Sequence, residues 1–446
     1  MSTANSRTAL SRLFADYGLL AVLLLLCVVC SVSTLGERRQ TARRAARIVA
    51  AKIDPSAGEH GRIVIFAGDE VYAGALERLL AEGQAGEVTR ITGSTHQMRA
   101  ALERLVARQV PISVIATTEA NRLIVRDVQQ ESAALAGARV LWPQRYWWPA
   151  FLTRDNLLNV AKKNVVIGVI AMGMTMVIIT GGIDLSVGSL AALSAVVAAW
   201  LIAHNGAKEA GLPAMLLGSL GAVGLCAAVG SFSGVMVTLF KVPPFVVTLA
   251  MMWVASGMAY IICGGRSIAD VPDSYDRLGM GADLLGIPNA LVLMLVIFIL
   301  GHMLMSRTTL GRHVYAIGGN RHAARLSGIR VNRVLLVVYT ASGALAGLGG
   351  VMLASQFTSG SANWGRMYEL YAIAAVVVGG TSLAGGEGKI FGTLIGVFTM
   401  AVVQNAMNLL EISAYAQYVV LGLIVLAVVL LDMIKRHGWR GLLTPE

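Results

Sequence analysis

Charged residues are scarce in this chain. Asp, Glu, Lys and Arg make up only 14% of its 446 residues, whereas 56% are hydrophobic and the mean hydropathy is +0.68. A soluble domain could not bury so much apolar surface, so a soluble globular protein is excluded. The apolar residues form blocks of roughly 17–25, long enough to cross about 30 Å of hydrocarbon as helices. The sequence therefore predicts a polytopic membrane protein.

Cysteine and acidic side chains are also few. The four cysteines (Cys27, Cys30, Cys226 and Cys263) lie inside apolar blocks, without the spacing of a zinc site or a disulfide framework. The 36 basic residues outnumber the 25 acidic ones, but they lie in short segments between apolar blocks, so nucleic-acid binding is not expected. No nucleophile, base and orienting acid come together in the pattern. Neither an enzyme nor a metal site is therefore predicted.

Ten apolar blocks are predicted to cross the membrane. The first, residues 19–32, follows Arg7 and Arg12 and could instead belong to a secretory signal cleaved near Ser31-Val-Ser33. We favour a retained helix because it makes the number of spans even. The other nine blocks are residues 164–180, 185–203, 213–240, 244–263, 288–305, 334–356, 370–383, 390–410 and 415–431.

A polar stretch between the first and second blocks has a different composition. Strand-like runs at 62–68, 88–92 and 112–116 alternate with helix-like patterns at 72–82 and 95–108. Such alternation predicts a small α/β unit with a parallel sheet. The expected fold class is an all-α polytopic membrane protein of about ten helices with this α/β domain inserted. The expected regions are residues 1–36 (a cytoplasmic tail and the first helix), 37–150 (the α/β domain), 151–434 (nine helices) and 435–446 (a cytoplasmic tail).

Loop charges predict the orientation in the membrane, because short loops rich in Lys and Arg stay in the cytoplasm. Residues 306–333 contain six arginines and no acid, whereas the preceding loop contains four aspartates between 270 and 283. Both termini are then expected in the cytoplasm, and the α/β domain outside it. Five arginines just after the first helix oppose this orientation, but a long domain crosses largely regardless of its charge.

A single acid, Asp184, stands in a run of more than thirty otherwise uncharged residues. Gly181 and Gly182 loosen the helix just before it, so Asp184 is expected at a membrane-edge turn or in a broken helix that lines a cavity. Its place before Leu185 and Ser186 also suits an acid at a helix start. Helix capping and direct contact with a solute are therefore alternative roles for this carboxylate.

The basic loop contains the pattern of a short helix. Asn320 can cap its start, Ala323, Ala324 and Leu326 favour helix, and Gly328 can end it. A merely solvated loop would explain the positive charge but not these helix signals. A compact amphipathic element exposed to the cytoplasm is predicted.

A glycine-rich segment, residues 379–392, has the composition of a phosphate-binding loop. Walker A spacing would require a glycine in place of Leu383, and Ile390 stands where Ser or Thr would hold magnesium. Nucleotide binding is rejected here. A tight cytoplasmic turn between two close-packed helices is predicted instead.

The segment around Asp184, the basic loop and the glycine-rich segment, in this order, resemble the permease subunits of ABC importers for ribose, arabinose, galactose and related sugars. The resemblance extends from Phe151 to Asp432 and includes residues 241–249. It implies a type II importer permease of the bacterial inner membrane. The implied partners are a second permease copy or a paralogue, cytoplasmic ATP-binding subunits and a periplasmic solute-binding protein. The resemblance also implies that those partners use ATP and Mg, while this chain binds no cofactor.

In the resembled family a short cytoplasmic helix docks on the ATPase. This implies a coupling role for Asn320, Arg321, Ala323, Ala324, Arg325, Leu326, Ser327 and Gly328. The chain departs from the family at Tyr371, where an acid is common, and in its α/β domain, which is similar to part of one lobe of a sugar-binding protein. Because a closed cleft needs two lobes, we expect this domain to be a docking or sensory module rather than a complete solute receptor.

A sugar path needs hydrogen-bonding groups that replace the water around the solute. The candidates are Thr180, Asp184, Ser186, Ser189, Thr248, Trp253, Gln404, Asn405 and Asn408. Hydrogen bonding between helices is the alternative role for each of them. Two other functions stay open at this point: an ATPase-independent secondary transporter or channel, and a membrane-anchored solute sensor.

Overall fold

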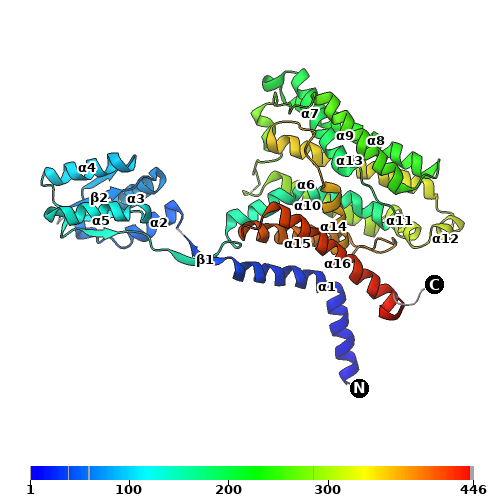
Figure 1. The fold of residues 1–446 in the computed structure, drawn as a ribbon, viewed down its shortest axis with the longest axis horizontal. Coiled ribbons are helices and arrows are strands. Elements are labelled where there is room, and N and C mark those ends of the chain that lie inside the picture. The colour runs from blue at the N-terminus through cyan, green and yellow to red at the C-terminus, as the bar shows by residue number, and fades with distance from the viewer. Residues whose placement is uncertain (1, 39, 59–60, 285, 442–446) are drawn as a thin grey trace. The chain divides into compact units, whose positions relative to one another are not determined.

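The computed structural model describes residues 2–38, 40–58, 61–284 and 286–441 (Figure 1). The chain divides into two compact units. One is Leu35–Pro149, called here the inserted unit; the chain before and after it forms the other, called the helical core.

The inserted unit contains a four-stranded parallel sheet in the order β3-β2-β4-β5. Its strands are β2 (Arg62–Phe66), β3 (Val88–Ile91), β4 (Ile112–Thr117) and β5 (Arg139–Leu141). On one face lie helices α2 (Ala42–Ala50) and α3 (Glu70–Glu82), and on the other lie α4 (Thr95–Ala107) and α5 (Arg122–Glu131). The strands and helices predicted between residues 62 and 117 are all present. The sequence analysis did not foresee α2, α5 or β5.

The unbroken apolar run at residues 63–66 belongs to β2, an inner strand of this sheet. Ile63 and Ile65 pack with the α2 and α3 side chains, whereas Val64 and Phe66 pack with α4 and α5. All four side chains are fully buried. Because a parallel sheet is covered on both faces, its central strand carries apolar residues at every position rather than at alternate ones.

The inserted unit begins and ends at one place. Strand β1 (Leu35–Arg38) pairs antiparallel with β6 (Tyr146–Pro149) to form its base. In the adjoining residues of the helical core, the Ala150 amide donates a hydrogen bond to the Thr34 carbonyl oxygen at 2.9 Å. The Phe151 amide donates another to Thr34 Oγ1 at 3.1 Å. The chain therefore leaves and re-enters the helical core through neighbouring residues.

Within the described residues, the helical core is built from eleven long or medium helices and the short α12. They are α1 (Ser2–Ser33), α6 (Arg154–Ile179), α7 (Val187–His204), α8 (Leu212–Thr238), α9 (Pro244–Cys263), α10 (Asn289–Arg307), α11 (Thr309–Gly319), α12 (Arg321–Leu326), α13 (Val331–Phe357), α14 (Tyr368–Val378), α15 (Ile390–Leu409) and α16 (Ala414–Gly441). Of the predicted C-terminal tail 435–446, residues 442–446 lie outside the described residues.

Seven described helices are long and apolar enough to cross a membrane: α6, α7, α8, α9, α10, α13 and α15. Shorter apolar helices cover residues 18–33, 368–378 and 414–430. Large apolar side chains on the outer helices are exposed, among them Leu220 of α8 (70%) and Ile261 of α9 (78%). Such a surface fits hydrocarbon, and the described chain is a multi-pass membrane protein.

Helix α13 packs against α6, α7 and α8, and Figure 1 shows α8 and α13 side by side. A Cβ atom on Gly343 of α13 would lie 3.0 Å from the Cα of Gly230 in α8. Ser194 of α7 donates a hydrogen bond to the Gly347 carbonyl oxygen at 2.6 Å. Small residues thus let these helices approach closely. By contrast, a Cβ on Gly224 of α8 would have no described atom within 4 Å from any other part of the chain, so not every glycine serves packing.

Candidate transport and coupling sites

The break between α6 and α7 holds Asp184, which is 1% exposed. Its Oδ1 accepts hydrogen bonds from the Ser186 amide at 3.1 Å and the Ser186 hydroxyl at 2.6 Å. Its Oδ2 accepts one from the Ser342 hydroxyl of α13 at 2.8 Å. Ser186, not Asp184, is the N-cap residue of α7. Asp184 therefore ties the turn before α7 to α13. Of its two alternative predicted roles, it does not cap α7, and contact with a solute stays a prediction.

Other predicted path residues lie buried around this break and bond within the protein. The Thr180 hydroxyl donates to the Val177 carbonyl oxygen at 2.7 Å. The Thr248 hydroxyl of α9 lies 3.2 Å from the Ile183 carbonyl oxygen, next to Asp184. In this conformation these hydroxyls, like that of Ser186, hold segments of the helical core together.

Three glycine-containing segments converge near the same break. The Gly386 amide donates a hydrogen bond to the Ile179 carbonyl oxygen at the end of α6 (2.8 Å). A Cβ on Gly385 would lie 3.0 Å from the Gly181 nitrogen, and one on Gly386 would lie 2.9 Å from the Gly319 backbone at the end of α11. Backbone therefore packs on backbone, which glycine permits because it has no side chain. The tight turn predicted between α14 and α15 is present.

The basic loop forms α12, with the start and stop that were predicted. Asn320 Oδ1 accepts a hydrogen bond from the Ala323 amide at 2.9 Å, and Gly328 has φ +81°, a conformation that favours glycine. Both local predictions are confirmed. Ala324 is buried against the helical core, whereas Leu326 is 77% exposed. Helix α12 thus presents one large apolar side chain outward.

A cavity of about 410 Å³ borders α12. Three cationic side chains line it: Lys241 from the connection between α8 and α9, and Arg321 and Arg325 from α12. Its other lining residues include the polar Thr238 and Asn332 and, in the described part of the chain, no acid. The cavity therefore offers positive charge beside the exposed Leu326, an arrangement that is complementary to an acidic surface.

Two predicted path residues, Ser189 and Trp253, line one cavity of about 380 Å³. Trp253 is 72% exposed, and Tyr260 donates a hydrogen bond to Asn363 Oδ1 at 2.7 Å. The sequence analysis missed most of the polar and aromatic lining, which comes from α9, from the connection between α13 and α14, and from the first turn of α14. These additional residues are Ser256, Tyr260, Asn363, Trp364, Arg366 and Glu369. We call this space the aromatic cavity.

Glu369 closes the aromatic cavity against the first turn of α7. A Cβ on Gly188 would overlap Glu369 Oε2 and the Gly365 carbonyl oxygen. The carboxylate can occupy this position only because residue 188 is glycine. An acid beside the first turn of a helix is stabilised by the amides that point out of that turn.

Gln404, Asn405 and Asn408 line a different and larger cavity of about 620 Å³. Asn405 of α15 exchanges two hydrogen bonds with Asn156 of α6, at 2.9 and 2.8 Å. Asn408 Oδ1 accepts one from Gln417 of α16 at 2.9 Å. The predicted path residues are thus divided between two cavities and the buried break, and Asn405 and Asn408 also bond helices together.

Known proteins similar to this chain are transport permeases. Residues 156–429 match a family profile described as the permease component of a branched-chain amino acid transport system. The ribose import permease protein of Escherichia coli (strain K12) is 40% identical over 292 residues, which are 65% of this chain and 88% of that protein. The ribose import permease protein of Bacillus subtilis (strain 168) is 42% identical over 289 residues, 64% of this chain and 87% of that protein. The L-arabinose transport system permease protein of Escherichia coli (strain K12) is 38% identical over 292 residues, 66% and 87% of the two chains. No solved structure matches the chain.

Proposed function

The chain belongs to the transport-permease family matched by residues 156–429, and from this membership we propose that it is the membrane-spanning subunit of an ATP-driven sugar importer. The observation that carries the proposal is the 40% identity to a ribose import permease over 88% of that protein's length. The proposed partners are a second permease chain, cytoplasmic ATP-binding subunits and a solute-binding protein outside the membrane. ATP and Mg are used by those subunits, and this chain contributes the path.

The aromatic cavity is the proposed contact site for the sugar. A sugar presents hydroxyl groups around an apolar ring, so it needs hydrogen-bonding partners together with flat apolar surfaces. Trp253, Trp364 and Tyr260 supply the flat surfaces, while Arg366 and Glu369 supply hydrogen-bonding groups of opposite charge. The buried break around Asp184 is the proposed joint between this cavity and α13, because Ser342 binds its carboxylate.

Helix α12 is the proposed docking element for an ATP-binding subunit. Its exposed Leu326 offers an apolar anchor, and the cavity lined by Lys241, Arg321 and Arg325 offers complementary charge for an acidic partner surface. Two contacts would carry motion inward from α12. One is the short connection, residues 327–330, that leads from α12 to α13. The other is the backbone packing against Gly386 of Gly319, which ends α11 just before α12.

We also propose ten membrane segments, with both termini in the cytoplasm and the inserted unit outside a bacterial inner membrane. The three shorter apolar helices would complete the seven long ones. Cysteines introduced at Arg78 of α3 and His322 of α12, both exposed and on the two proposed sides, test this arrangement. With the unmodified chain as background, a membrane-impermeant maleimide is expected to label Arg78→Cys in intact spheroplasts and His322→Cys only after permeabilisation. The reverse pattern would contradict the orientation.

Transport driven by ATP is the decisive test of the proposed function. The chain is co-reconstituted in liposomes with candidate ATP-binding subunits and a solute-binding protein, and uptake of labelled D-ribose and L-arabinose is measured. Uptake of at least one sugar is expected with ATP, and none with a non-hydrolysable analogue. Equal uptake in liposomes that lack the ATP-binding subunits would instead favour a secondary transporter or channel.

A further inference from the structure

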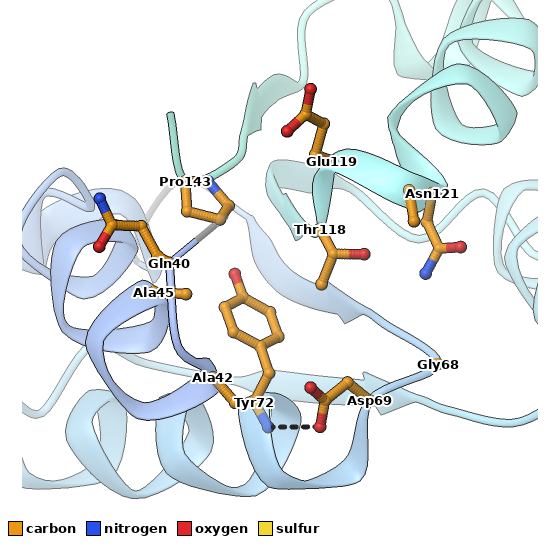
Figure 2. A pocket seen from close by; sticks show the side chains of 11 residues that line it. Gln40, Ala42, Ala45, Gly68, Asp69, Tyr72, Thr118, Glu119, Asn121 and Pro143 are labelled. Atoms are coloured by element: carbon orange, nitrogen blue, oxygen red, sulfur yellow. Dashed lines mark hydrogen bonds between the residues drawn. The ribbon is translucent and has the colours of Figure 1, made fainter. Parts of the chain in front are cut away.

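The inserted unit contains a cavity of about 330 Å³ at the carboxyl ends of its strands (Figure 2). Gly68 and Asp69 follow β2, residues 118–121 follow β4, and Pro143 follows β5; all of them line it. The start of α2 supplies a further wall through Ala42 and Ala45. The matched family profile begins only after this unit, at residue 156, so the permease family does not account for the cavity.

The strand order places this cavity at a topological switch point. From β2 the chain passes through α3 to β3 on one side, and then through α4 to β4 on the other side of β2. The connections therefore diverge between the carboxyl ends of β2 and β4, and leave a crevice between the loops that follow them. In open α/β sheets this crevice is where small ligands bind.

The floor of the cavity is held rigidly. Tyr72 is 1% exposed, and its hydroxyl donates a hydrogen bond to the Thr117 carbonyl oxygen at 3.2 Å. Burial raises the pKa of the Tyr72 phenol above its ordinary value, so the hydroxyl remains a protonated donor well above neutral pH. Asp69 Oδ1 accepts hydrogen bonds from the Val71 amide at 2.9 Å and the Tyr72 amide at 3.1 Å, as Figure 2 shows for Tyr72. These bonds fix the direction of the carboxylate at the start of α3.

The lining chemistry favours a neutral ligand rich in hydroxyl groups. Among the described residues, neither Lys nor Arg lines the cavity, so the described lining offers an anion such as phosphate no positively charged partner. Glu119 is paired with Arg145 at 2.9 Å, which offsets one of the two lining carboxylates. The remaining polar groups are amides and a hydroxyl, from Gln40, Asn121 and Thr118. The Gln40 Oε1 atom is buried and, within the described residues, has no hydrogen-bond partner.

We propose that this cavity binds one neutral monosaccharide, a pentose or a hexose, independently of the path through the membrane. Asp69, Thr118 and Asn121 would exchange hydrogen bonds with the sugar hydroxyls at the strand ends. The volume is at the lower end of the range for small-molecule sites, which suits a single sugar ring. A second lobe is not needed to form the walls, because α2 closes the side that the strand ends leave open. The inserted unit would then be a sugar sensor on the permease.

Isothermal titration calorimetry on the full chain in lipid nanodiscs tests this proposal. The probes are D-ribose, L-arabinose, D-xylose, D-glucose and D-galactose, and at least one is expected to bind at one site per chain. Asn121→Ala removes an amide that makes no helix-capping bond, and it is expected to weaken binding by about tenfold or more. Ala42→Phe fills the cavity and is expected to abolish binding at this site, whatever the aromatic cavity binds. Gln130→Ala, at an exposed position of α5 outside the lining, is the matched control and should bind as the unmodified chain does.

Two results would overturn the proposal. One is the absence of binding heat with all five sugars. The other is heat that is unchanged in Asn121→Ala and Ala42→Phe but lost in Trp253→Ala, since that pattern would place the sugar in the aromatic cavity. If Ala42→Phe fails to purify as a folded chain, Asn121→Ala decides alone. Because uptake is not the readout, failure here leaves the proposed transport function untouched.

Discussion

Replacing Leu326 by Asp is expected to abolish ATP-driven uptake while leaving the permease folded. The Leu326 side chain is 77% exposed at the end of α12, so its loss removes little packing within the chain. At a docking contact, however, a large apolar side chain serves as an anchor that must leave water. Burying an unpaired carboxylate there instead would cost about 3 kcal/mol, roughly a hundredfold in affinity. The neighbouring cationic cavity strengthens the effect, because a partner surface that matches it would repel the new acid.

The measurement is co-purification of the ATP-binding subunits together with sugar uptake in proteoliposomes. Leu326→Met keeps an apolar side chain of similar volume and should retain most uptake. Leu326→Asp should insert in the membrane and elute like the unmodified chain, yet lose the ATP-binding subunits. Full uptake by Leu326→Asp would show that α12 is not the docking element.

Replacing Gly188 by Ala is expected to reduce sugar uptake by about tenfold or more, although only one methyl group is added. That methyl would overlap Glu369 Oε2 and the Gly365 carbonyl oxygen. Either the carboxylate leaves the first turn of α7 or the helix moves, and overpacking of this kind costs about 1–3 kcal/mol. Both outcomes reshape the aromatic cavity, since Glu369, Gly365 and Ser189 all line it.

Gly224→Ala is the matched control for this prediction. It adds the same methyl group to α8, where no described atom other than those of the adjoining helix backbone and chain neighbours lies within 4 Å of the new position. Its uptake rate and thermal unfolding midpoint should equal those of the unmodified chain or slightly exceed them, because alanine favours helix over glycine. Wild-type uptake by Gly188→Ala, with an unchanged sugar concentration for half-maximal rate, would remove the aromatic cavity from the transport path.

Local signals were sufficient to predict much of the fold from the sequence. The Asn320 cap and the Gly328 stop depend on neighbouring residues only, and the central strand at 62–66 is marked by its own apolar run. Each of the seven long spans can likewise be recognised from the hydropathy of its own segment. The three shorter apolar helices do not meet the same criterion of length, so the predicted count of ten depends on them.

The candidate sites could be predicted only in part, because they depend on contacts between distant segments. The hydrogen bond from Ser342 to Asp184 joins residues 158 positions apart, and no sequence pattern near either residue indicates it. Trp364 and Arg366 belong to a connection between helices, where periodicity carries no signal. The cavity of the inserted unit follows from the strand order, which the alternation of strands and helices leaves undetermined.

The hydrogen bond between Thr34 and Ala150 explains how the helical core can hold an inserted domain without a change in its helices. Since the two ends of the insertion lie one hydrogen bond apart, α1 and α6 need only the spacing that a short hairpin would give them. A domain of another size or fold, with ends equally close, would satisfy the same junction. The junction is thus a natural point of fusion, through which such a permease can gain or exchange an accessory module by recombination without any change to its helices.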